Sequence, residues 1–119
     1  MDIADVEKIC KALPHVTVGI KWKSDLVYMV AEKMFCVVDL EAMPTSVAFK
    51  VPSDSFEELA ASANCKPAPY FAQHKWVTVI DFNKIPIADL EQHIKTSYQL
   101  VTARLTNKVR KELGIDKPE

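Results

Sequence analysis

Residues 16–51 have the sequence VTVGIKWKSDLVYMVAEKMFCVVDLEAMPTSVAFKV, which is rich in strand-forming residues. Apolar and polar residues alternate along 16–22 and again along 46–51, which is the period of a half-exposed strand. Ala31-Glu32 is a short polar break between two apolar segments, a pattern typical of a hairpin. The stretch therefore predicts four antiparallel strands in sequence.

The alternation also assigns faces to these strands. On the first strand the apolar face holds Val16, Val18, Ile20 and Trp22. In the segment 33–41, one face holds Met34, Cys36, Val38 and Leu40, and the other holds Phe35, Val37 and Asp39. Because both faces of 33–41 are largely apolar, we expect this strand to lie in the centre of the sheet.

A helix is expected on each side of these four strands. Residues 3–13 carry apolar side chains at helical intervals after Asp2, a good N-cap residue, and Pro14 forbids continuation. Beyond the fourth strand, the segment 54–57 has the form of a capping box and predicts a short helix that ends near Asn64.

The segment 65–74 is the one long irregular stretch that we expect, and a function carried on a loop would lie here. Residues 75–82 then alternate as a fifth strand, which places Trp76 among apolar neighbours as a structural residue. Apolar spacing predicts a long helix over about 87–105. Thr106 can cap a last short helix that ends at Gly114.

These elements predict an α+β fold. It has an antiparallel sheet of about five strands, an N-terminal helix, one helix between strands four and five, and C-terminal helices packed on the sheet. The 119 residues suit a single domain over 1–119, and a chain of this size buries about two-thirds of its surface on folding.

Composition limits the compartment and the partners. Fifteen Lys and Arg against sixteen Asp and Glu give a net charge of −1, which argues against a binder whose whole surface is basic. The three cysteines have neither disulfide-framework nor metal-ligand spacing, so we expect free thiols, no metal site and a cytoplasmic location. The N-terminus begins with acidic residues and lacks a secretory leader, and the longest apolar run, 26–31, is too short to span a membrane.

No catalytic constellation stands out, so no catalytic residue, cofactor or enzymatic activity is predicted. With two glycines, Gly19 and Gly114, the chain cannot build the usual phosphate or dinucleotide loops. Cys65 beside Lys66 could be a reactive thiol, although a plain loop cysteine is the favoured interpretation. The carboxylates of Asp39 and Glu41 are similarly interpreted as a strand emerging into its turn.

Basic residues are the remaining candidates. Arg104, Lys108 and Arg110 cluster without an intervening acid, and Lys50 and Lys75 accompany aromatic residues of the 65–76 region. Cations among aromatic rings suit phosphate neutralisation with base stacking. The tentative nucleic-acid-binding residues are Lys50, Lys75, Arg104, Lys108 and Arg110. The competing interpretation is structural, with basic side chains stabilising a helix C-terminus.

Three segments, 33–41, 74–79 and 97–108, together resemble the MmcQ/YjbR family in order and separation. The resemblance implies a CyaY-like or double-wing α+β fold. A DNA-binding role has been suggested for the family from fold analogy. The family usually has glycine-containing turns where this chain has Ala31-Glu32 and Asn64-Cys65.

We therefore expect a cytoplasmic binding module, monomeric or weakly dimeric, with nucleic acid as the leading ligand. The alternative is a protein-interaction or small-molecule-binding module, which an apolar groove around the 65–74 loop would favour. A cryptic enzyme is the third reading of the sequence.

Overall fold

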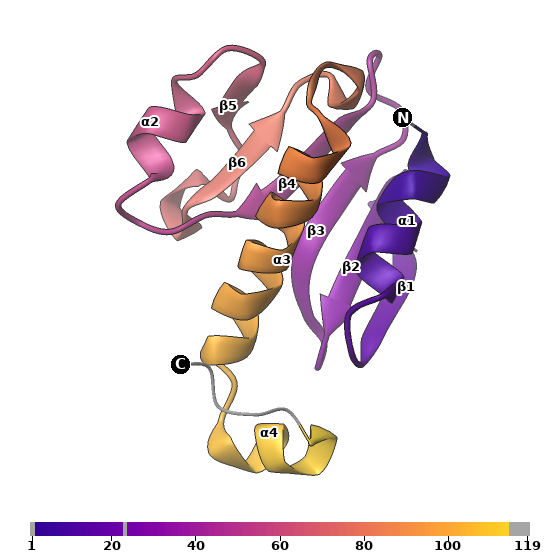
Figure 1. Cartoon of the computed structure of the whole chain (residues 1–119), viewed down its shortest axis with the longest axis vertical. Coiled ribbons are helices and arrows are strands. Elements are labelled where there is room, and N and C mark those ends of the chain that lie inside the picture. Colours follow the sequence, from indigo (N-terminus) through magenta and orange to yellow (C-terminus); the bar gives the residue numbers. More distant parts are fainter. Residues whose placement is uncertain (1, 23, 115–119) are drawn as a thin grey trace.

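The computed structural model describes residues 2–22 and 24–114 and contains a six-stranded antiparallel sheet (Figure 1). The strands follow one another across the sheet in the order β1-β2-β3-β4-β6-β5. Their bounds are β1 (Val16–Lys21), β2 (Asp25–Val30), β3 (Lys33–Asp39), β4 (Ser46–Lys50), β5 (Cys65–Pro67) and β6 (Trp76–Val79). The predicted α+β class and the four sequential strands are confirmed.

The described residues form the helices α1 (Ile3–Lys11), α2 (Phe56–Ala60), α3 (Ile87–Ala103) and α4 (Asn107–Leu113), with 3-10 turns η1 (Ala72–His74) and η2 (Phe82–Lys84). Of these helices, α1 and α3 cover one face of the sheet. In Figure 1, α1 and α3 lie side by side in front of the sheet, whereas α2 packs at its β5–β6 end. The opposite face of the sheet carries none of these helices.

The core lies between the sheet and the two helices. Its largest fully buried side chains include Tyr28, Phe35 and Phe49 from the sheet and Leu90 and Ile94 from α3. Burial of such side chains contributes about 1.5–3 kcal/mol each to folding. The main apolar core therefore lies on the side of the sheet that α1 and α3 cover.

Ser97, which is fully buried on α3, fixes this helix against two strands. Its hydroxyl donates to the carbonyl of Phe35 at 2.6 Å and accepts from the amide of Lys50 at 2.9 Å. Because both hydrogen bonds are made by one side chain, α3 is held in register with β3 and β4.

The two terminal helices have the caps that the sequence predicts. Asp2 and Asp5 form a reciprocal capping box at the start of α1, which then ends at Lys11, two residues earlier than predicted. Thr106 accepts from the amide of Val109, and Gly114 ends α4 at a φ of 69°, where glycine avoids strain.

The predicted capping box of α2 is wrong. The residue before the helix is Ser55, in a helical backbone conformation, and it makes no side-chain cap. An N-cap residue normally has an extended backbone, which Ser55 lacks. The helix starts at Phe56, one residue later than a capping box over 54–57 requires. It ends at Ala60 rather than near Asn64 and is only five residues long.

The segment predicted to be irregular supplies an additional strand, β5. Residues Cys65–Pro67 pair with β6 at the sheet edge, so the prediction of about five strands was one short. Strand β6 ends at Val79 because the Asp81 amide and carbonyl are both bonded to the Asn64 side chain, at 2.9 and 2.8 Å. Turn η2 then directs Phe82 into the core.

A β-bulge changes the faces of β3. The register between β2 and β3 shifts at Tyr28/Met29, which leaves Phe35 as an extra residue. Phe35 therefore points into the core, in edge-to-face contact with Tyr98, and not to the face of Val37 as predicted. Alternation alone cannot reveal such a shift.

Trp22 also departs from its predicted face. The first strand ends at Lys21, and Trp22 has a φ of 51°. The turned backbone carries the indole toward Phe71, with 6.2 Å between ring centroids. Trp22 thus leaves the face of Val16 and stands on the side of the sheet that α1 and α3 do not cover.

No helix within residues 2–22 and 24–114 is long and apolar enough to cross a membrane.

Candidate functional site

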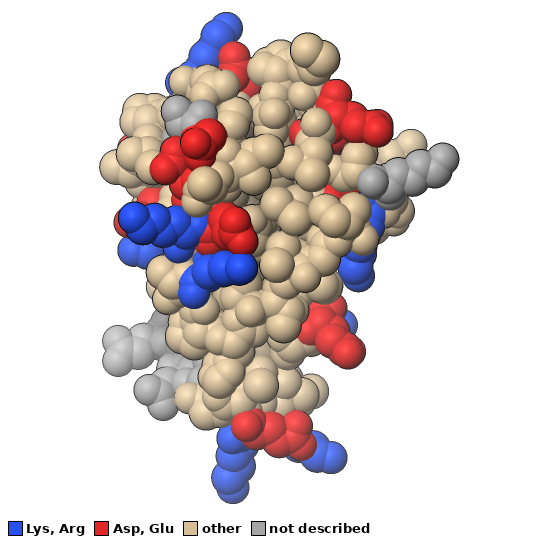
Figure 2. Space-filling view, turned by 90° about the vertical axis from the view of Figure 1, so that its right-hand side faces the viewer, with Lys and Arg blue, Asp and Glu red and all other residues tan. Residues whose placement is uncertain are grey.

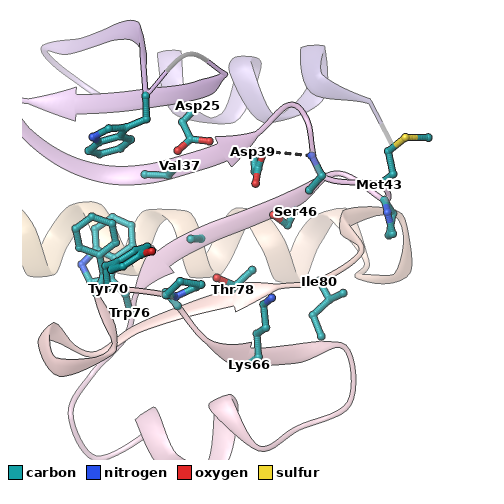
Figure 3. Close-up of a pocket in the computed structure, with 17 residues that line it drawn as sticks. Asp25, Val37, Asp39, Met43, Ser46, Lys66, Tyr70, Trp76, Thr78 and Ile80 are labelled. Carbon is teal, nitrogen blue, oxygen red and sulfur yellow. Dashed lines mark hydrogen bonds between the residues drawn. The ribbon is translucent and has the colours of Figure 1, made fainter.

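The sheet face that α1 and α3 leave uncovered is hollowed into a groove of about 740 Å³ (Figure 3). The centre of its floor consists of one residue from each of three adjacent strands, Val37 of β3, Ala48 of β4 and Thr78 of β6. These three are register neighbours, since Val37 pairs with Ala48 and Ala48 with Thr78. Small side chains at the centre of the floor leave the depth of the groove open.

The segment 66–71 forms one wall of this groove. The amide of Ala68 donates to the carbonyl of Trp76 at 3.1 Å, and the amide of Phe71 donates to the carbonyl of Ala68 at 3.2 Å. Tyr70 has a φ of 67° and is 93% exposed, so its ring stands out from the wall. The wall is therefore held by backbone hydrogen bonds and presents an aromatic side chain to solvent.

Three aromatic rings follow one another at one end of the groove. Phe71 lies 6.2 Å from Trp22 and 5.8 Å from Trp76, measured between ring centroids. Trp76 is only 4% exposed, which confirms its predicted burial among apolar neighbours, whereas Trp22 is 58% exposed. This end of the groove offers an aromatic surface to a ligand.

Two carboxylates stand at the β2–β3 side of the floor. Asp25 and Asp39 are register partners on β2 and β3, and both line the groove (Figure 3). The Oδ1 of Asp39 accepts from the amides of Glu41 and Ala42 at 3.0 and 3.1 Å, which fixes the carboxylate in the turn. Burial, followed by the charges of Asp39 and Glu41, raises the pKa of Asp25.

Lys66 supplies a cation at the β5 side of the groove. It pairs across the sheet with Thr78, whose hydroxyl lines the floor with that of Ser46. Three strand spacings separate β5 from β3, which is about 14 Å. The groove is thus polar at both sides and apolar or aromatic between them.

Three of the five predicted nucleic-acid-binding residues are brought together near the C-terminal end of α3. Burial first, then the charges of Arg104 and Lys75, lowers the pKa of Lys50. The Lys50 ammonium donates to the carbonyl of His74, and the Lys75 ammonium lies 5.1 Å from the centre of the Phe56 ring. Lys50 and Arg104 line a second hollow of about 550 Å³.

The other two predicted residues lie on α4. Lys108 is exposed. Arg110 is buried, and its guanidinium donates to the carbonyls of Thr102 and Ala103 at the C-terminal end of α3. These bonds tie α4 to carbonyls in the last turn of α3, so Arg110 has a structural task.

Charges do not segregate on the face shown in Figure 2. Acidic and basic side chains are interspersed there, with an uncharged strip between them. Cys10 and Cys36 are fully buried, and Cys65, the candidate reactive thiol, is half-buried at the start of β5.

Sequence reasoning missed part of the groove. It placed Asp39 with Glu41 and gave Asp25 and Trp22 no role, because the bulge in β3 and the turned backbone at Trp22 leave no mark on the alternation. The 66–71 wall had a signal, since prolines and aromatic residues gather there. The sequence predicts an irregular stretch there and places a loop-borne function in it, although not its strand pairing or its role as a groove wall.

The geometry defines a class of protein: a helix-backed antiparallel sheet with a groove on its uncovered face. The YjbR family model matches residues 11–100, and the chain belongs to this family. The predicted resemblance is thereby confirmed.

Two solved structures are similar to this chain. The crystal structure of a Deinococcus radiodurans protein with a DUF419 domain has a TM-score of 0.86 and 27% identity, covering 98% of this chain and 91% of that chain. A Pseudomonas syringae protein has a TM-score of 0.70 and 16% identity, covering 84% of this chain and 98% of that chain, and shows the shared fold. No curated protein matches the chain in sequence.

Proposed function

We propose that this protein is a small-molecule-binding module whose ligand lies in the groove on the uncovered sheet face. The observation that carries the proposal is the groove itself, a hollow of about 740 Å³ at the 66–71 segment. Ligand sites in proteins typically have volumes of about 300–1,000 Å³, with apolar walls and a few polar groups. An apolar groove at this loop is the feature that distinguishes a small-molecule or protein partner from nucleic acid.

A second function, weak binding of nucleic acid, is favoured by one observation. Lys50, Lys75 and Arg104 lie close together, and the charges of the last two add to burial, the main cause, in lowering the pKa of Lys50. A phosphate would relieve this repulsion, and such binding would carry little sequence preference. We rank it below the groove because Lys50 and Lys75 already have partners within the protein and Arg110 is buried.

The proposal can be tested by blocking the groove. Small aromatic fragments of neutral, anionic and cationic charge would be added to the isotope-labelled chain, and amide chemical shifts would be mapped by NMR. We expect the largest shifts in β3, β4, β6 and the segment 66–71. Ala48→Phe places a ring on the floor of the groove and should abolish them.

Ala88→Phe is the matched control, because Ala88 is exposed on α3, away from the groove. It should leave fragment binding unchanged. Shifts that are scattered over the whole protein, or that survive Ala48→Phe, would contradict a ligand site in the groove.

A further inference from the structure

The charges and rings of the groove indicate what kind of ligand it takes. Resting on the proposed function, we propose that the groove binds a small organic cation, whose aromatic body lies against Trp22 and Phe71 and whose protonated amine faces Asp25 and Asp39. Three features of the groove support this ligand: its carboxylates, its aromatic rings and its dimensions.

The carboxylates form a like-charged pair that the described residues do not neutralise. Asp25 and Asp39 are direct register partners, and opposed residues on neighbouring antiparallel strands have Cβ atoms about 4.5–5.5 Å apart. Two like charges at this separation repel each other. A cation between them would convert this repulsion into attraction.

No ion pair within residues 2–22 and 24–114 involves either carboxylate. The two ion pairs present there join Lys11 to Glu7 and Lys95 to Glu91 on helix surfaces. Lys21 is the register partner of Asp25 on β1 and makes no ion pair with it. Lys66, the cation that lines the groove, starts three strands away from Asp39.

The positions of the two carboxylates are suited to a donor ligand. Asp39 is held by two backbone amides through Oδ1, and its Oδ2 accepts no hydrogen bond from the described residues. The Asp25 carboxylate likewise accepts none from them. A protonated amine carries up to three N–H donors, enough to reach both carboxylates at once.

The rings complete the site. Trp22 is exposed and inclined at 48° to Phe71, and both line the same groove as the carboxylates. Exposed indole is costly to leave in water and binds apolar bodies, and its face also attracts cations. An aromatic amine uses both the ring surface and the charge pair, whereas an anion would face repulsion from Asp25 and Asp39.

The dimensions favour a small molecule over a macromolecular partner. The groove is bounded by the 66–71 wall and by the turn around Met43 and Pro44. Its volume of about 740 Å³ accommodates a drug-sized or metabolite-sized molecule.

The test compares three probes that share a phenyl ring: phenethylamine, 2-phenylethanol and 3-phenylpropionate. Each would be titrated into the isotope-labelled chain and followed by amide chemical shifts. We expect phenethylamine to bind about tenfold more tightly than 2-phenylethanol, and 3-phenylpropionate to bind most weakly. The combined variant Asp25→Asn/Asp39→Asn should remove the preference for the amine, since Asn keeps the size and the Oδ1 acceptor.

Asp54→Asn is the matched control, because Asp54 is an exposed aspartate on the turn before α2, outside the groove. It should leave the preference unchanged. Equal affinities of the three probes within the groove would overturn the cation inference while the proposed function stands. If none of the probes shifts groove residues, both fall. A preference for 3-phenylpropionate would overturn the charge assignment.

Discussion

Asp25 and Asp39 lie side by side on the uncovered face of the sheet because the chain contains one extra residue between them. Counting outward from the Ala31-Glu32 turn pairs Asp25 with Val38 and would place Asp39 opposite Ser24. The bulge at Phe35 shifts the pairing by one, so that Asp25 meets Asp39. The same shift directs Phe35 into the core and Asp39 into the groove.

Asp25 should make stability depend on pH. Its pKa in the folded protein is raised by burial first and then by the charges of Asp39 and Glu41. The cation that faces Asp25 on the neighbouring strand β1 is Lys21. The folded state therefore holds the proton more tightly than the unfolded state. This contribution is fully present below the unfolded pKa and is lost as pH rises through the folded pKa.

Asp25→Asn should consequently raise the melting temperature at about pH 7, and the gain should shrink at about pH 3, where Asp25 is protonated in both states. Thermal unfolding of the variant and the parent chain at the two pH values checks this. An equal gain at both values would show that the charge is not the cause.

The hairpin turn should be improved by glycine. Ala31 and Glu32 have φ values of 51° and 64°, a region in which side chains are strained and glycine is not. Ala31→Gly should stabilise the protein by about 1 kcal/mol, measured by denaturant unfolding.

Ala88→Gly provides the comparison for the turn variant. Ala88 lies in helix α3, where glycine should destabilise by about 1 kcal/mol. If both variants destabilise the protein by the same amount, the turn at Ala31 does not have the strain that its backbone angle indicates.

Arg110 should be a stability residue. It is 8% exposed, and its guanidinium bonds two carbonyls at the end of α3. Arg110→Ala should lower the free energy of unfolding by about 2 kcal/mol, since it removes a buried, charged donor from two hydrogen bonds that join α4 to α3. Lys108→Ala, on the exposed side of α4, should change it by less than about 0.5 kcal/mol.

Nucleic-acid binding through Lys50, Lys75 and Arg104 would have a definite salt dependence. If all three neutralise phosphates, log affinity should fall against log salt with a slope of about −2.7, and Arg104→Ala should reduce that slope by about one. Fluorescence anisotropy with a labelled duplex measures it. The absence of salt-sensitive binding at low ionic strength would remove this second function.

Local signals predicted much of the fold. The strands 16–51 follow from alternation, and the caps Asp2, Thr106 and Gly114 act through their own backbone, so each could be identified without tertiary information. The α2 cap failed because Ser55 adopts a helical conformation that a sequence pattern does not specify.

The candidate groove was harder to predict. The 66–71 wall had a visible composition, but the Asp25–Asp39 pair depends on a bulge, and the aromatic contact of Trp22 with Phe71 joins segments nearly fifty residues apart. Arg110 illustrates the reverse case, in which a basic residue with the composition of a binding site is committed to capping a helix.

The most direct measurement is a crystal structure of the chain with phenethylamine bound. We expect the phenyl ring to lie against Trp22 and Phe71, and the amine nitrogen to lie within about 2.7–3.2 Å of a carboxylate oxygen of Asp25 or Asp39. A phenethylamine molecule bound outside the groove, or one whose amine points away from both carboxylates, would contradict it.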